Sequence, residues 1–365
     1  MTDATPAPAV SFSTDVPAAP LAALILKNLA LTILTLGVYR FWGKTHIRRF
    51  LWNHTLIQGE RLDYTGTGGE LFKGFLLVLV TVFLPLLLIN AAAQALVEQE
   101  NLAAAGALFF VFTAAAMYLP GVAIFRAARY RLSRTRWRGV RFGLEGKGWS
   151  YGLWVMLFLL ILVATMGLSY PVQRVGLWRR LWDQARFGNK AFHFDGGVRN
   201  LYPRFLLVWT VFALGVTLAV GIPGLIAAQY APVAEPPGGI PAAEQMAYLA
   251  LTMTFPLFML VMLPVWLSYK ALELRTLAEG LGFEGVRFSF DVRFWPLLRL
   301  LFGNMLLVML TLGLGGPFAA ARSLRFVCDR LHPVGEVDFA AIAQGAAPAP
   351  ASGEGLAEMF DSVDI

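Results

Sequence analysis

The sequence predicts an all-α polytopic membrane protein, built from tandem pseudo-repeats and carrying short strands on its cytoplasmic side. Composition is the first observation behind this prediction: 57% of the 365 residues are hydrophobic and 15% are charged, whereas soluble domains average about 25% charged. Long uncharged stretches and clustered basic residues are the second and third. The single cysteine, Cys328, excludes an internal disulfide framework.

Six uncharged stretches of 22 to 30 residues supply the expected membrane segments. About 20 apolar residues span a bilayer as a helix, and buried helices of soluble proteins are rarely so long or so numerous. The stretches are residues 74–97, 101–125, 148–173, 205–234, 245–269 and 300–321. A weaker seventh stretch, residues 20–39, is interrupted by Lys27.

The basic residues set the expected topology. Of 30 Lys and Arg residues, 29 fall in five segments, whereas the loops 91–102 and 229–244 hold none and carry glutamates. The five segments are residues 40–73, 126–147, 171–204, 269–299 and 322–330. Because basic loops are retained in the cytoplasm, we expect these segments and the C-terminus on the cytoplasmic side and the two loops on the other.

Two stretches, 148–173 and 300–321, each join one basic segment to the next. If all seven stretches crossed the bilayer, 12 of the 29 clustered charges would lie outside the cytoplasm. We therefore expect three re-entrant or in-plane segments, packed in a bundle that satisfies their turns, and four full crossings. The full crossings are residues 74–97, 101–125, 205–228 and 246–268.

A tetrapeptide that ends in glycine recurs along the chain. Leu34-Thr35-Leu36-Gly37 returns as Leu310-Thr311-Leu312-Gly313 and, in degenerate form, as Ala164-Thr165-Met166-Gly167. A second glycine follows after 22, 21 and 22 residues, with an aromatic residue soon after it. The six motif glycines are Gly37, Gly59, Gly167, Gly188, Gly313 and Gly335. Duplication explains these intervals better than chance recurrence in a leucine-rich sequence, and it predicts short aromatic strands suited to a small sheet.

The repeat divides the chain into segments. We expect one membrane repeat over residues 20–147, a second over 148–295 and a partial third over 296–339. We also expect two disordered tails, residues 1–19 and 340–365. The first is rich in Ala and Pro, and the second is rich in Ala, Gly and Pro before it turns acidic.

Residues 20–80 carry a family resemblance. Its pattern runs from Asn28 through Gly37-Val38-Tyr39, Phe41-Trp42-Gly43-Lys44 and Arg48-Arg49 to Gly59…Tyr64-Thr65-Gly66…Glu70-Leu71-Phe72. This pattern resembles the signature of the YjgN-like family, which consists of bacterial inner-membrane proteins of unknown function. The resemblance implies a multi-pass protein of the bacterial inner (cytoplasmic) membrane. It supplies no catalytic residues.

Arg40, Lys44 and Arg48 lie at i, i+4 and i+8 and would form one cationic stripe on a helix. Such a helix is typical of the membrane interface, where each basic residue contributes about 1 kcal/mol of attraction to anionic lipid. The plain interpretation is that the stripe only determines topology. The sharper hypothesis is a specific anionic lipid or phosphate site, built from Arg48, Arg49, Arg179 and Arg180.

Polar residues at the expected membrane depth suggest a second kind of site. Lys27 and Asn28 are functional candidates for this reason. Asn28 and Asn304 each stand nine residues before a motif glycine, so with Lys27 they could line a polar cavity near the re-entrant turns. The alternative is that Lys27 snorkels to the surface and the asparagines cap breaks in the helices.

Other chemistry finds little support. The four histidines lie in or beside basic segments that repel a metal ion, so we expect neither a metal site nor a cofactor. Hydrolase, protease, nucleotide and dinucleotide motifs are absent from the sequence, so we expect a protein that is not an enzyme. Membrane apposition accounts for the pI of about 9.7, which makes anionic membrane lipids the expected partners rather than nucleic acid.

Two functions remain open. One is a transporter or channel for a small anionic solute, with Lys27, Asn28 and Asn304 at the pathway. The other is a non-catalytic lipid-binding or scaffold protein of the cytoplasmic leaflet, which would use the basic helices. The substrate, the protein partners and the oligomeric state are not determined by the sequence.

Overall fold

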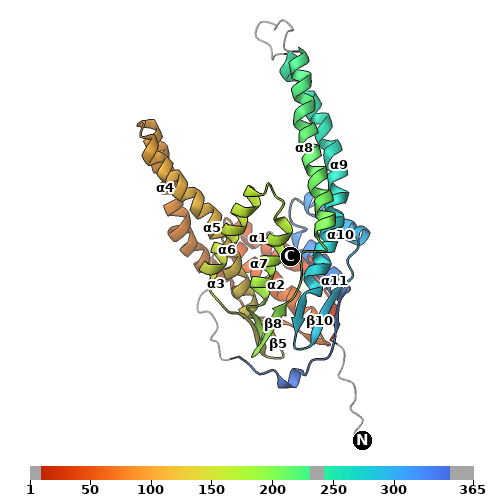
Figure 1. The fold of residues 1–365 in the computed structure, drawn as a ribbon. Coiled ribbons are helices and arrows are strands. Elements are labelled where there is room, and N and C mark those ends of the chain that lie inside the picture. The colour runs from red at the N-terminus through yellow and green to blue at the C-terminus, as the bar shows by residue number, and fades with distance from the viewer. Residues whose placement is uncertain (1–9, 231–241, 346–365) are drawn as a thin grey trace.

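The computed structural model describes residues 10–230 and 242–345, and two long helical arms rise from one side of a body of shorter helices and strands (Figure 1). The first arm contains α3 (Gly68–Val78), the π-helical η1 (Leu79–Phe83), α4 (Leu84–Glu98) and α5 (Leu102–Arg134). The second contains α8 (Tyr202–Tyr230) and α9 (Ala242–Glu279). Most of the expected loop at 229–244 lies outside the described residues.

The arms supply the helices that can cross a bilayer. Four helical stretches of the described residues are long and apolar enough to do so, by length and composition. They are Gly68–Glu98, Leu102–Arg134, Tyr202–Gln229 and Glu244–Glu279. Their positions match the four stretches that the sequence assigns to full crossings.

Three other apolar helices are each 17 residues long, and after each of them the chain turns and runs back as a second helix. They are α1 (Ala18–Leu34), α6 (Gly148–Ala164) and α10 (Phe294–Leu310). At 1.5 Å per residue each is about 26 Å long, short of the roughly 30 Å of hydrocarbon in a bilayer. Each packs against the helix that follows its turn, so the pairs are helical hairpins. The returning helices are α2 (Arg40–Asn53), α7 (Tyr170–Trp182) and α11 (Gly316–Cys328).

The tip of each hairpin is a Schellman turn with a large apolar residue in the left-handed conformation. Leu36, Met166 and Leu312 have φ of 51°, 48° and 49°, and a glycine at φ near 90° follows each. Their side chains are 96%, 80% and 93% exposed. Because the left-handed conformation strains a non-glycine residue, each tip has both a strained backbone and an exposed apolar side chain.

A threonine holds each tip. Thr311 Oγ1 donates to the carbonyl of Leu307 at 2.6 Å and accepts the N–H of Gly315 at 2.7 Å. Thr35 and Thr165 occupy the corresponding places in the other two hairpins and make the same pair of contacts. The hydroxyl therefore bridges the end of one helix and the start of the next.

Short strands follow the helices and form two antiparallel sheets. β5 (Thr135–Trp137) pairs with β6 (Val140–Leu144), β7 (Ala185–Phe187) with β8 (Lys190–Phe194), and β9 (Leu281–Phe283) with β10 (Val286–Phe290). These hairpins, with β4 (Asp63–Tyr64) and β11 (Leu331–Val334) at the edges, form an eight-stranded sheet in chain order. The smaller sheet contains β1 (Phe12–Thr14), β2 (Thr55–Ile57) and β3 (Glu60–Arg61).

The sheets correct the expected all-α class. The protein is mainly helical, with an eight-stranded sheet below the helices (Figure 1). The sequence indicates short aromatic strands after the motif glycines, suited to a small sheet. In the structure two of these glycines, Gly59 and Gly188, lie at the turns of β-hairpins, at φ of 77° and 59°. Neighbouring hairpins then pair with one another, which a local pattern does not reveal.

Part of each segment that was expected to be a disordered tail is folded. Within the N-terminal tail, β1 pairs with β2 and α1 begins at Ala18. Within the C-terminal tail, Ile342 is buried and Ala343 exchanges hydrogen bonds with Asn189. The remaining parts, residues 1–9 and 346–365, lie outside the described residues. The boundary assigned between residues 295 and 296 falls inside α10.

Gly37→Ala should lower the free energy of unfolding by about 1–2 kcal/mol, because an alanine is strained at φ of +92° although its Cβ would meet no atom within 4 Å. Thermal unfolding in mild detergent, followed by tryptophan fluorescence, measures the effect. Gly69→Ala is the matched control, since it also has open space but no positive φ. Equal midpoints for the two variants would contradict the strain argument.

Candidate functional site

A cavity of about 310 Å³ lies between α2, α11 and the C-terminal end of α5. Three cationic side chains line it, and the lining includes no acidic residue of the described chain. The cationic residues are Lys44, Arg48 and Arg131, and the other walls are apolar. The first turn of α11, with Gly316 and Pro317, also lines the cavity, and the helix dipole adds partial positive charge there. We call this space the cationic cavity.

Packing positions the cations of this cavity. Lys44 and Arg48 lie one turn apart on α2, so both reach the same side of the helix. Arg48 Nη1 donates to the hydroxyl of Tyr64 at 3.2 Å, and the guanidinium carbon lies 5.5 Å from the Tyr64 ring centroid. Because Tyr64 is buried, Arg48 is held in one orientation before any ligand arrives.

Two residues that were predicted to bind an anion, Arg49 and Arg179, donate hydrogen bonds to backbone carbonyls instead. Arg49 donates to the carbonyls of Tyr64 at 3.2 Å and Gly66 at 2.9 Å. Arg179 donates to the carbonyl of Gly196 at 2.8 Å, the same 17 residues ahead. Both guanidiniums therefore tie a helix to the loop beyond its strands.

Sequence reasoning missed two arginines that make the same contact. Arg129 Nε donates to the carbonyl of Leu144 at 3.0 Å, and Arg275 Nε donates to the carbonyl of Val292. Like Arg49 and Arg179, each stands nine or ten residues before the glycine of its β-hairpin. This spacing is the signal that could have found them.

The remaining candidate arginines lie elsewhere. Arg180 lines a separate cavity of about 260 Å³ with Lys147, and its guanidinium carbon lies 3.6 Å from the ring centroid of Trp154. Burial, followed by the nearby charge of Arg179, lowers the pKa of Arg180. Arg40 lies over the ring of Phe41 at 5.0 Å. The six predicted cations are thus divided among several places, and only Lys44 and Arg48 share the cationic cavity.

The predicted pathway residues lie in two separate hairpins. Asn28 Nδ2 donates to the carbonyl of Gly43 at 3.2 Å, and Asn304 Nδ2 donates to that of Ala319 at 3.3 Å. Each asparagine therefore joins the two helices of its own hairpin across 15 residues, although its Oδ1 is buried with no partner among the described residues. Lys27 is exposed on α1.

A buried carboxylate on α9 was not expected from the sequence. Glu273 is fully buried, and its Oε1 accepts from Arg174 Nε at 2.8 Å and from Lys270 Nζ at 2.9 Å. The Arg174 contact fastens the second arm to α7, whereas Lys270 lies on α9 itself. The sequence signal is a glutamate three residues after a lysine at the end of an uncharged stretch.

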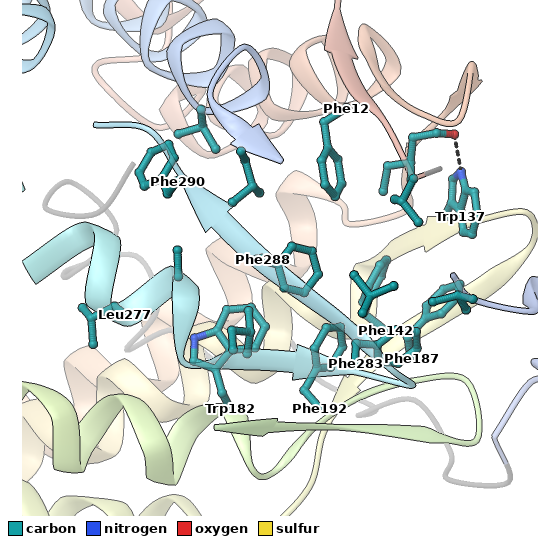
Figure 2. Close-up of a pocket in the computed structure, with 18 of the residues that line it drawn as sticks. Phe12, Trp137, Phe142, Trp182, Phe187, Phe192, Leu277, Phe283, Phe288 and Phe290 are labelled. Carbon is teal, nitrogen blue, oxygen red and sulfur yellow. Dashed lines mark hydrogen bonds between the residues drawn. The ribbon is translucent and has the colours of Figure 1, made fainter. Parts of the chain in front are cut away.

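A larger cavity of about 420 Å³ lies between the strands and the C-terminal ends of α5, α7, α9 and α11 (Figure 2). Every side chain that lines it is apolar or aromatic. The β-hairpins contribute aromatic pairs five residues apart: Trp137 and Phe142, Phe187 and Phe192, and Phe283 and Phe288. The Trp137 indole N–H donates to the carbonyl of Ile57 at 3.2 Å. We call this space the β-chamber.

The histidines do not form a metal centre in residues 10–230 and 242–345, where no group of three or more His, Cys, Asp or Glu side chains could hold an ion. His46 lies in cationic surroundings on α2. Burial, then the charges of Arg49 and Lys27, lower its pKa below 6.5.

Comparison with known proteins decides the family. A family model described as "Bacterial protein of unknown function (DUF898)" matches residues 9–359. The chain belongs to this family. Inner membrane protein YjgN of Salmonella typhimurium is 26% identical over 169 residues, which cover 42% of this chain and 40% of that protein. Inner membrane protein YjgN of Escherichia coli is 29% identical over 144 residues, which cover 39% and 32%.

The expected YjgN-like family is thereby confirmed. With its membrane-capable helices and inner-membrane relatives, this DUF898 protein is a multi-pass protein of the inner membrane. The matched part spans less than half the length of these curated relatives. No solved structure matches the chain.

Glu273→Ala should destabilise this DUF898 protein by about 3 kcal/mol, because it leaves two cations without their buried partner. The lower end of the usual range applies, since the Arg174 side chain is 40% exposed. Glu279→Ala, at an exposed position on the same helix, is the control and should change stability by less than about 0.5 kcal/mol. The free energies of unfolding of the two variants are compared in detergent. Equal values would show that the Glu273 carboxylate does not stabilise the contact between α9 and α7.

Proposed function

We propose that this inner-membrane protein binds anionic phospholipid, without catalysis, in the cationic cavity between α2 and α11. The observation that carries the proposal is the meeting of three cations with apolar walls in one space. A phospholipid presents both a phosphate and hydrocarbon, so it would use the whole lining. Free phosphate would contact only the cationic side chains and would leave the apolar walls without a partner.

The alternative function, solute transport, has less support from the positions of the residues. A pathway through Lys27, Asn28 and Asn304 requires these side chains to line a common space. In the structure the asparagines join helices within separate hairpins, and Lys27 is exposed on α1. Their arrangement therefore gives transport no specific support, and lipid binding is the function that we favour.

The proposal includes the membrane arrangement. The three helical hairpins enter the cytoplasmic leaflet and return, with the basic segments on the cytoplasmic side. Their length of about 26 Å supports this, because it is short for a crossing. The exposed tips Leu36, Met166 and Leu312 also support it, because their side chains are favourable in hydrocarbon and unfavourable in water.

The proposal also includes an origin by internal duplication. A short apolar helix, a turn, a returning helix and strands occur in this order three times, and a long helical arm follows the first two. The asparagine contact across 15 residues and the arginine contact across 17 recur with the same spacing. Shared ancestry accounts for both.

The double variant Lys44→Gln, Arg131→Gln should weaken selective binding of phosphatidylglycerol over phosphatidylcholine by about 30-fold, at about 1 kcal/mol per lost cation. Native mass spectrometry of protein from mixed-lipid nanodiscs measures the ratio of retained lipids. The double variant Lys73→Gln, Arg136→Gln removes the same charge at exposed positions outside the cavity and should keep the selectivity. Equal losses in both variants would mean that charge acts non-specifically.

Gly197→Cys should react with a membrane-impermeant maleimide only after intact cells are opened, whereas Gln99→Cys, in the loop between α4 and α5, should react in intact cells. Cys328 gives little background, because burial followed by the charge of Asp329 raises the pKa of its thiol to about 11. The Cys328→Ala background removes it altogether. Labelling of Gly197→Cys in intact cells would show that the chain crosses the membrane once between residues 148 and 197, so that α6 and α7 do not form a re-entrant hairpin.

A further inference from the structure

The β-chamber is too large and too uniform to be a packing defect. Protein interiors hold few voids larger than a water molecule, yet this hollow, which is partly open at the surface, measures about 420 Å³. An apolar cavity of about 150 Å³ already stays dry and takes up benzene. A space of this size lined only by hydrocarbon and aromatic rings therefore suits an elongated apolar occupant.

The lining indicates the chemistry of that occupant. Aromatic rings from three β-hairpins, from β1 and from α7 converge on one hollow (Figure 2). The indole N–H of Trp137 is donated to the carbonyl of Ile57, whereas those of Trp178 and Trp182 are buried without a hydrogen-bond partner among the described residues. The lining therefore offers two donors and no charged side chain, so a sugar, nucleotide or peptide backbone would leave most of its polar groups buried without partners, whereas a hydrocarbon chain fits.

The chamber and the cationic cavity are neighbours on the same elements. On α5, Arg131 lines the cationic cavity and Leu132 lines the chamber. On α11, Leu324 lines the cavity and Val327, one turn later, lines the chamber. The positive lining thus adjoins the apolar one, as a phosphate adjoins the acyl chains of a phospholipid.

We propose that the β-chamber binds one acyl chain of a membrane phospholipid whose phosphate lies in the cationic cavity. This inference rests on the proposed lipid binding and adds where the chain goes. The lipid chain leaves the bilayer and is held between the helix ends and the sheet. The protein therefore withdraws part of a lipid from the membrane rather than only touching its headgroup.

The experiment uses phosphatidylglycerol brominated on one acyl chain, in proteoliposomes of the full chain. Bromine quenches tryptophan at contact, and Trp137 lies on β5 at the sheet side of the chamber. The fluorescence difference between the protein and Trp137→Phe isolates the Trp137 contribution. We expect the brominated lipid to reduce this contribution by at least half.

Ala278→Phe places a ring in the chamber and should abolish the quenching of Trp137. The control is Ala191→Phe, at an exposed position next to a chamber residue on β8, and it should leave the quenching unchanged. Thermal unfolding of each variant shows that it is folded. Native mass spectrometry supplies a second readout, in which Ala278→Phe should lose one bound lipid.

The outcomes separate this inference from the proposed function. Retained phosphatidylglycerol with unquenched Trp137 would overturn the chain site and leave headgroup binding standing. Equal quenching by brominated phosphatidylcholine, without retention of the anionic lipid, would support the chain site and overturn the cationic headgroup site. Loss of both retention and quenching would overturn both.

Discussion

Backbone pairing between successive β-hairpins is the interaction on which the rest of the structure depends. Each helical unit ends in strands, and each hairpin pairs with the next from β4 to β11. A single hydrogen bond contributes only about 0.5–1.5 kcal/mol, but a continuous ladder draws the C-terminal ends of α5, α7, α9 and α11 to one place. The β-chamber exists because these ends meet above a shared sheet.

The arginine contacts reinforce the same junction. Arg49, Arg129, Arg179 and Arg275 each reach from a helix to a carbonyl beyond the following strands, which for Arg129 is that of Gly146. They fix the angle at which helix and strands meet, so much of the basic charge of this chain has a structural use. The proposed lipid site uses cations that line a cavity instead. The number of basic residues alone is therefore a poor guide to where an anion binds.

The helical hairpins show how much a local pattern predicts. Tetrapeptides such as Leu34-Thr35-Leu36-Gly37 indicate three equivalent turns, and the turns share φ angles and threonine contacts. Schellman turns are closed by residues within six positions, so a sequence window contains all the partners. The extent of the sheet was underestimated for the opposite reason, since β6 pairs with β7 across an intervening α6–α7 hairpin.

The sequence by itself determined the uncharged stretches, the clustering of basic residues, the glycine turns and the family pattern, because each depends on neighbours along the chain. Only the tertiary structure decided which cations share a cavity. Lys44 and Arg131 are far apart in sequence and meet through the packing of α2 with α5 and α11. The burial of Glu273 and the β-chamber are likewise set by contacts between distant segments, whose geometry no local spacing contains.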